Sequence, residues 1–345
     1  MLKAAALSWL FVSALLAQTP PSPHQAAPAS RSDSKANIKS LVNAAWRGDL
    51  PRVKALIAQK LDLDAQDDDG NIALVSAFSH VEVLKVLIAA GATLEQKTRQ
   101  GCTVLMTVAS SGTTVCGSEI GGDLRMTTPY PLDSLRFLLS LHPDLEVTDL
   151  RRCTALARAA RANWDRAPFP PRVSERAALA LAGRASVDGV KLLLAAGARV
   201  EGASGCEDGS PLVVAAEAGN GEVVSALVAA GANKESTMAS GSNKGETPLI
   251  AAAVQGHADV VSILLAAGAD IEGRDKFPLF YAGSSSFNIN YATALIMAAR
   301  AGKTEVVRVL LAAGAKREAT DHWGHTALDV ARHWKHEDIV ALLTK

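Results

Sequence analysis

Residues 247–270 read TPLIAAAVQGHADVVSILLAAGAD, and this stretch decides the fold. Its apolar side chains recur at three- and four-residue spacing in two groups, one on each side of Gly256. That spacing places each group on one helical face, so the stretch predicts two short amphipathic helices joined by a turn. Thr247 and Pro248 suit the start of the first helix, and Gly256 and Gly268 suit left-handed helix ends.

The end of this stretch returns along the whole chain. One unit of two helices is too small to bury its apolar faces alone, so successive units are expected to stack into one continuous core. The copies are LIAAGA at 87–92, LLAAGA at 193–198, LVAAGA at 227–232 and LLAAGA at 264–269 and 310–315, with degenerate copies at 56–62 and 138–144.

The repeated unit resembles the ankyrin repeat family, whose pattern runs D-x-x-G-x-T-P-L-H-x-A-A-x-x-G-H-x-E-V-V-x-L-L-L-x-x-G-A. The resemblance covers about 37–345 and implies an all-α, ankyrin-type helix-turn-helix solenoid with short turn or hairpin fingers and about eight stacked repeats. The histidine after T-P-L is replaced in the best copies, by Val213, Ile250, Ile296 and Asp329.

The spacing of the copies is longer than the usual repeat of about 33 residues at three places. These places predict insertions near 113–131, 162–186 and 276–290. The fourth repeat has two possible alignments. Either its first helix lies near 153–162, or 175–198 forms the repeat and 153–162 is an additional helix.

The N-terminal stretch MLKAAALSWLFVSALLA at 1–17 has a lysine, an apolar run and small residues at its end. This pattern predicts a signal peptide, because the alternative, a membrane anchor, needs about 20 apolar residues. Residues 18–36 are rich in Pro, Ala and Ser and predict a disordered linker, followed by the repeat domain at 37–345. We therefore expect an exported protein, either periplasmic or secreted, without stable membrane insertion after cleavage.

The charges of the chain balance, with 35 Lys and Arg against 35 Asp and Glu. A neutral chain generates no long-range field that would attract nucleic acid, so no nucleic-acid partner is expected. Catalytic motifs such as GxSxG, a Walker loop, HExxH and a dinucleotide fingerprint are absent from the sequence. We expect no enzymatic activity and no cofactor, and a monomeric chain.

The four cysteines, Cys102, Cys116, Cys153 and Cys206, include no CxxC pair. Cys102 and Cys153 occupy equivalent positions in neighbouring units, and stacked helices lie too far apart for that pair to bond. Cys116 could reach Cys102 or Cys153 if export exposes the chain to oxidation. Cys206 is expected to be a free thiol in a turn.

Variable positions of the family pattern, on turn tips and on the exposed face of first helices, supply the candidate partner-binding residues. Exposed tryptophans with polar neighbours are typical of binding hot spots. Trp334 has a second interpretation, since it could pack as a cap over the last repeat. The candidates are Trp46, Arg47, Asp68, Asp69, Asn71, Arg99, Gln100, Arg151, His322, Trp323, His325, His333 and Trp334.

The resemblance implies a non-enzymatic scaffold that binds a partner protein on the concave surface formed by turn tips and first helices. One alternative is a metal-binding accessory protein that uses the histidines of DHWGHTALDVARHWKH at 321–336. The other is an enzyme whose site lies in the insertions.

Overall fold

The computed structural model describes residues 31–110, 131–161, 187–203, 206–237, 245–275 and 291–344. Helices form all the regular secondary structure of these residues, which confirms the expected all-α solenoid. The helices are α1 Arg31–Arg47, α2 Leu50–Ile57, α3 Ala73–Ser76, α4 Val81–Ala89, α5 Val104–Ala109, α6 Leu132–Ser140, α7 Ala155–Arg161, a helix over 187–195, α9 Pro211–Ala218, α10 Gly221–Ala229, α11 Pro248–Gln255, α12 Ala258–Ala266, α13 Ala294–Arg300, α14 Thr304–Ala312, α15 Ala327–His333 and α16 Glu337–Leu343.

The unit over 247–270 folds as its sequence predicts. Thr247 caps α11 by accepting the N–H of Ile250 at 3.4 Å, and Pro248 occupies the first turn, where no amide hydrogen is needed. The helix ends at Gly256, which has a φ of 93°, and α12 is followed by Gly268 with a φ of 84°. Glycine allows these left-handed helix ends without steric cost.

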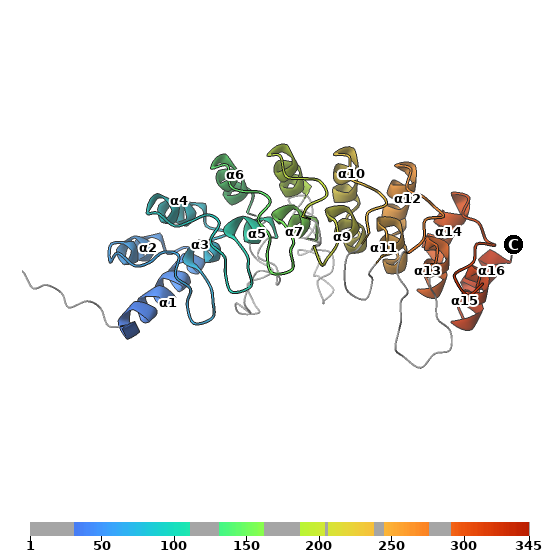
Figure 1. The fold of residues 1–345 in the computed structure, drawn as a ribbon, viewed down its shortest axis with the longest axis horizontal. Helices are drawn as coiled ribbons and strands as arrows, with labels where there is room; N and C mark the ends of the chain where they lie inside the picture. Colours follow the sequence, from blue (N-terminus) through green and yellow to red (C-terminus); the bar gives the residue numbers. More distant parts are fainter. Residues whose placement is uncertain are drawn as a thin grey trace, which may run out of the picture.

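The helices form two rows along an elongated, gently curved molecule (Figure 1). In the row of first helices, α9, α11, α13 and α15 each contact the next, and α10, α12, α14 and α16 do so in the second row. Small alanine side chains let the first helices pack closely, and Ala252 and Ala253 of α11 are fully buried. The core is therefore continuous along the solenoid.

The position of α7 decides between the two alignments of the fourth repeat. This helix contacts both α5 and α9 and so belongs to the row of first helices. The alternative, in which 153–162 is an additional helix, is wrong. The three expected insertions lie outside the described residues, apart from residue 131 at the edge of the first.

The expected linker is too long at its C-terminal end. Helix α1 begins at Arg31, so residues 31–36 are helical rather than disordered. Once the apolar part of a helix has formed, each added residue costs little. Helix α1 can therefore extend toward the N-terminus through polar residues that have no apolar spacing. Residues 1–30, which hold the expected signal peptide and the rest of the linker, lie outside the described residues.

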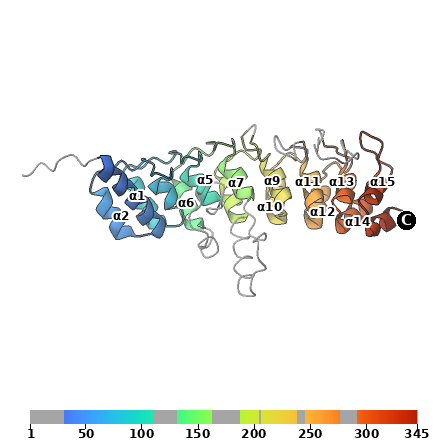
Figure 2. The same ribbon diagram turned by 90° about the horizontal axis from the view of Figure 1, so that it is seen from below.

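The segments that join the second helix of one unit to the first helix of the next are called fingers here. They lie along one edge of the molecule (Figure 2). Two of them contain a bridge between backbone segments, one pairing Arg274 with Thr293 and the other pairing Thr320 with Thr326. The fingers and the first helices behind them position the candidate site.

Candidate functional site

An aspartate inside a finger holds that finger in shape. Asp149 Oδ1 accepts the N–H of Arg151 at 2.9 Å and the N–H of Cys153 at 3.0 Å. Equivalent pairs of bonds are made by Asp67 and Asp321. Because these bonds satisfy backbone donors in a loop, they fix the direction in which the tip residues project.

Carboxylates also tie several neighbouring fingers together. Glu146 Oε1 accepts the N–H of Arg199 at 2.9 Å, and its Oε2 lies 2.8 Å from Nε of the same arginine. Such bonds set the spacing of the fingers along the solenoid. The same carboxylate-to-backbone bond joins Asp64 to Thr93, Glu201 to Asn233, Glu235 to Asp270 and Glu272 to Lys316.

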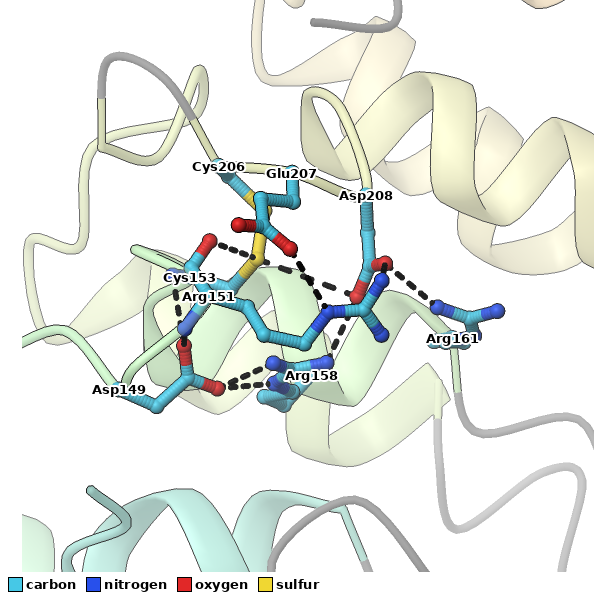
Figure 3. Close-up of a disulfide and its surroundings, with 8 residues drawn as sticks. All are labelled: Asp149, Arg151, Cys153, Arg158, Arg161, Cys206, Glu207 and Asp208. Atoms are coloured by element: carbon cyan, nitrogen blue, oxygen red, sulfur yellow. Dashed lines mark hydrogen bonds and ion pairs between the residues drawn. A yellow bond between two sulfur atoms is a disulfide. The ribbon is translucent and has the colours of Figure 1, made fainter. Parts of the chain in front are cut away.

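A buried ion network adds to the Glu146–Arg199 link between the fingers that precede α7 and α9 (Figure 3). The guanidinium of Arg158, only 2% exposed, donates from Nε to Asp149 Oδ2 at 2.7 Å and from Nη1 to Asp208 Oδ2 at 2.7 Å. Arg151 and Arg161 approach the same Asp208 from the surface, at 2.8 and 2.9 Å. A charge inside a protein is tolerated only when paired in this way, so Arg158 locks two fingers together.

The disulfide beside this network corrects the expectation for Cys206. Cys206 is bonded to Cys153, with 4.5 Å between their Cα atoms, and both residues are buried. The free-thiol prediction is wrong because it considered no partner for Cys206, whereas Cys153 and Cys206 lie in neighbouring fingers close enough to bond. The bond also excludes a pairing of Cys116 with Cys153.

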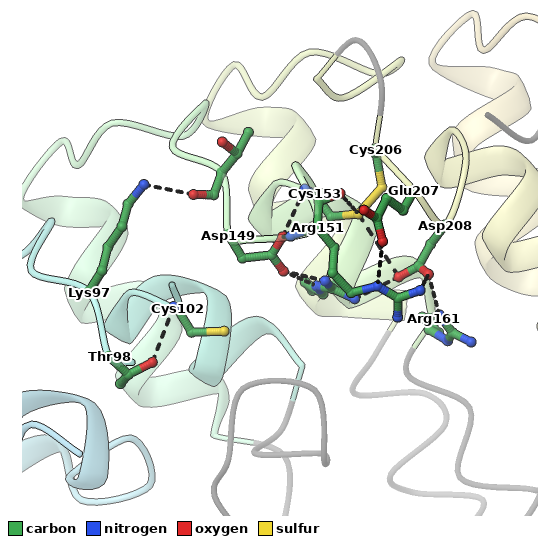
Figure 4. A network of polar contacts seen from close by, with 12 residues as sticks. Lys97, Thr98, Cys102, Asp149, Arg151, Cys153, Arg161, Cys206, Glu207 and Asp208 are labelled. Atoms are coloured by element: carbon green, nitrogen blue, oxygen red, sulfur yellow. Dashed lines mark hydrogen bonds and ion pairs between the residues drawn. A yellow bond between two sulfur atoms is a disulfide. The ribbon is translucent and has the colours of Figure 1, made fainter. Parts of the chain in front are cut away.

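The expectation that Cys102 and Cys153 do not bond to each other is confirmed, since Cys153 bonds to Cys206. Cys102 is itself disulfide-bonded, and Cys116 lies outside the described residues. Figure 4 shows how the polar contacts continue from this region toward the N-terminus. Lys97 Nζ donates to Thr148 O at 2.7 Å, so three consecutive fingers are connected.

The candidates nearest the N-terminus serve partly to fold their own fingers. Trp46 is half-buried near the end of α1, where its carbonyl accepts Nε2–H of His80 at 3.1 Å, and Arg47 is exposed. Asp68 and Asp69 are exposed on a finger tip. Asn71, in the same finger, donates to Asp67 through its backbone and its side chain.

Arg99, Gln100 and Arg151 occupy the next fingers. Arg99 is exposed and donates from Nη2 to Asp68 O at 2.9 Å, and Gln100 is half-buried. Arg151 is bound to Glu207 at 3.3 Å as well as to Asp208, so it belongs to the ion network. The helices that follow these fingers, α5 and α7, lie toward the middle of the molecule, away from α15, which follows the finger of the candidates after residue 320 (Figure 1).

The C-terminal candidates form an aromatic cluster, here Tyr291, His322 and Trp323. The ring centroids of His322 and Trp323 lie 5.2 Å apart, and those of Tyr291 and His322 lie 6.1 Å apart. Trp323 is 56% exposed and Tyr291 is 45% exposed. Tyr291 was missed from the sequence because it borders the expected insertion at 276–290, where the repeat pattern gives no register.

His333 and Trp334 form a second exposed pair at the end of α15, with ring centroids 5.5 Å apart. Trp334 is 42% exposed. His325 instead lies 3.0 Å from Asp321 Oδ2 within its finger. No group of three or more His, Cys, Asp or Glu side chains among the described residues is placed to hold a metal ion.

Two acidic residues that sequence patterns do not single out, Glu246 and Asp275, are almost fully buried on neighbouring fingers. The pKa of Glu246 is raised to about 8, chiefly by burial and then by the charges of Glu217 and Asp275. Burial likewise raises the pKa of Asp275 to about 6, against the lowering effect of the N–H that Ala292 donates to it. Both carboxyl groups therefore hold protons more tightly than usual.

Comparison with known proteins supports the assignment of the repeats. A protein family described as "Ankyrin repeats (3 copies)" matches residues 176–275 and 276–345. A search of curated protein sequences found no significant match. No helix in the described part of the chain is long and apolar enough to cross a membrane. The family match and the stacked helix pairs agree, and residues 176–345 belong to the ankyrin repeat family.

Proposed function

We propose that this protein is a non-enzymatic scaffold that binds a partner protein along its fingers and first helices after export. Ankyrin repeats are in general protein–protein interaction modules. The observation that carries the proposal is the aromatic cluster of Tyr291, His322 and Trp323, which is exposed although the core buries most other large apolar side chains of the described residues. Exposed aromatic residues grouped on one surface favour a binding site.

The aromatic cluster lies on two fingers that are fixed to each other. Arg274 Nη1 donates to Tyr291 O at 2.7 Å and to Thr320 O at 2.5 Å, so one guanidinium bridges the fingers. A rigid surface loses less conformational entropy when a partner binds. Trp334, at the end of α15, is a further exposed aromatic residue of the last unit.

Export is part of the proposal and rests on two features. The stretch at 1–17 has the composition of a signal peptide. The disulfide between Cys153 and Cys206 belongs to the class of bond that persists in oxidising compartments and is rare where thiols are kept reduced. N-terminal sequencing of the protein recovered from the exported fraction should return a residue near Gln18, whereas Met1 would contradict export.

The binding proposal is tested by capture from the exported fraction with three baits, the unchanged protein, Trp323→Ala and Leu141→Ala. Leu141 is also an exposed apolar residue, but it lies at the end of α6, in the row of second helices. We expect a stoichiometric partner that is retained by Leu141→Ala and lost by Trp323→Ala. Equal retention by both variants would contradict binding at the aromatic cluster.

A further inference from the structure

Two carboxylates on neighbouring fingers each have a buried oxygen without a hydrogen-bond donor. Glu246 is 2% exposed and Asp275 is 1% exposed, and neither Glu246 Oε2 nor Asp275 Oδ2 accepts a hydrogen bond. Glu246 directly precedes the N-cap of α11, and Asp275 lies in the finger that leads from α12 to α13. Burying an acceptor without a donor is costly, so the pair requires an explanation.

The equivalent aspartates of the other fingers show what Asp275 Oδ2 lacks. Asp275 Oδ1 accepts the N–H of Ala292 at 2.8 Å, as expected for a finger aspartate. In the other fingers the second oxygen is also bound, because Asp67 Oδ2 accepts Asn71 Nδ2–H, Asp149 Oδ2 accepts Arg158 Nε–H, and Asp321 Oδ2 lies 3.0 Å from His325 Nδ1. Asp275 alone among these four has no donor at that oxygen.

The charge around the pair is also unbalanced. The charged groups that act on Glu246 are Glu217, Asp275 and Arg300, and those that act on Asp275 include Arg274 and Asp321. Acidic groups therefore outnumber basic groups among these described residues. The network around Arg158, in contrast, combines three arginines with three carboxylates, which are Arg151, Arg158, Arg161, Asp149, Glu207 and Asp208.

The helix behind each finger accounts for the difference. Arg158 is the fourth residue after Thr154, which directly precedes α7, and Met297 is the fourth residue after the N-cap Thr293 of α13. Met297 is buried and carries no charge. The chain thus supplies its own guanidinium to Asp149 and supplies none from the corresponding position to Asp275.

We propose that Glu246 and Asp275 form a binding site for a basic side chain, Lys or Arg, of the partner protein. This inference rests on the proposed protein-binding function and defines one part of the partner's chemistry. The incoming cation takes the role at Asp275 that Arg158 has at Asp149. Arginine suits the site best, because its planar fork can donate to two carboxylates at once, as Arg158 does.

Binding at this site couples to proton release. The raised pKa values of Glu246 and Asp275 mean that a proton occupies the pair in part at neutral pH, and an entering guanidinium replaces it. The guanidinium itself stays charged at any pH where the protein is folded. Access to the buried oxygens requires these two fingers to separate against the bond from Asp270 N–H to Glu235 Oε1, and loops open at lower cost than the helix stack.

The test uses the full chain with labelled side-chain carboxyl carbons and two small probes, N-acetyl-arginine amide and its uncharged isostere N-acetyl-citrulline amide. We expect the arginine probe to shift the carboxyl resonances of Glu246 and Asp275, with an affinity that rises from pH 6 to pH 9 by up to about tenfold per unit. The citrulline probe should have no effect. Equal effects of both probes, or shifts produced by calcium chloride but not by the arginine probe, would overturn the proposal.

Variants provide the internal control. Asp275→Asn keeps the oxygen that accepts the Ala292 N–H, and both this variant and Glu246→Gln should no longer bind the arginine probe. Glu222→Gln, on the exposed start of α10, should bind the probe as the unchanged protein does. Met297→Arg should supply the cation internally and abolish probe binding, whereas Met297→Leu should not. Normal binding of the probe by Asp275→Asn and Glu246→Gln would overturn the proposal even if Met297→Arg does not fold.

This result can be separated from the test of the proposed function. If a partner is captured through Trp323 but the arginine probe does not act on Glu246 and Asp275, the basic-side-chain site is wrong and the scaffold function stands. If the probe binds as expected but no partner is captured, the site stands and the scaffold function is contradicted.

Discussion

Lys60 and His142 stand where other second helices carry a left-handed glycine. Their φ angles are 56° and 52°, whereas Gly268 and Gly314 have φ angles of 84° and 92°. A residue with a Cβ atom pays roughly 1–2 kcal/mol for this conformation, and glycine does not. The repeat pattern is therefore strong enough to impose the left-handed helix end even on unsuitable residues.

Replacing Lys60 or His142 by glycine should stabilise the protein. After the greater flexibility of glycine in the unfolded chain is subtracted, we expect a gain of about 0.5–1 kcal/mol in the free energy of unfolding from each change. Urea denaturation measures this quantity. A loss of stability in both variants would show that these side chains make contacts that outweigh the backbone strain.

Glu246 makes stability depend on pH. Its pKa is near 8 in the folded protein against an ordinary value of 4.5, so the stability it contributes is fully present below about pH 4.5 and is lost as the pH rises through about 8. We expect Glu246→Gln to be more stable than the unchanged protein at pH 8.5, on the order of 3 kcal/mol, and to gain nothing at pH 4. Thermal unfolding at the two pH values checks this, with Glu222→Gln as the exposed control.

Arg158 of α7 joins two fingers through a buried charge. Replacing it by methionine leaves Asp149 and Asp208 buried without this cation, and we expect a loss of about 3–5 kcal/mol in the free energy of unfolding. Arg161 binds the same Asp208 but is partly exposed, so Arg161→Met should cost less than about 1 kcal/mol. Equal losses in the two variants would mean that burial does not govern this network.

The helices themselves could be predicted because each depends on local sequence. Thr247 and Pro248 begin α11, Gly256 ends it, and regularly spaced apolar residues bury one face, all within ten consecutive positions. The resemblance to the ankyrin family then gave the order in which the helices stack. The sequence predicted that ordered structure begins at residue 37, whereas α1 begins at Arg31, because the polar start of this helix has no apolar pattern.

The contacts between fingers could not be predicted in the same way. The bond between Cys153 and Cys206 and the contacts of Arg158 with Asp208 join residues separated by 53 and 50 positions, across the insertion expected at 162–186. Register on the two sides of an insertion cannot be read from a repeat pattern. The raised pKa of Glu246 could not be predicted either, because it comes chiefly from burial, which the repeat pattern does not indicate at that position.

Because each unit contacts only its neighbours, a local defect should remain local along the solenoid. Gly268→Val provides the defect, since its φ of 84° is unsuited to a β-branched residue and no atom lies within 4 Å of the added Cβ. We expect faster amide hydrogen exchange in α11 to α14 and unchanged exchange in α3 to α6. Uniform acceleration through all described helices would show that the molecule unfolds as one unit.

The described parts of the fingers lie along one edge of the molecule (Figure 2), and the aromatic cluster marks the end of that edge expected to bind. The most direct measurement is isothermal titration of the captured partner onto the unchanged protein, Trp323→Ala and Leu141→Ala, with the melting temperature of each recorded alongside. The scaffold account predicts that Trp323→Ala raises the Kd about tenfold or more without lowering the melting temperature, while Leu141→Ala leaves the Kd unchanged. A Trp323→Ala protein that binds as tightly as the unchanged protein would contradict it.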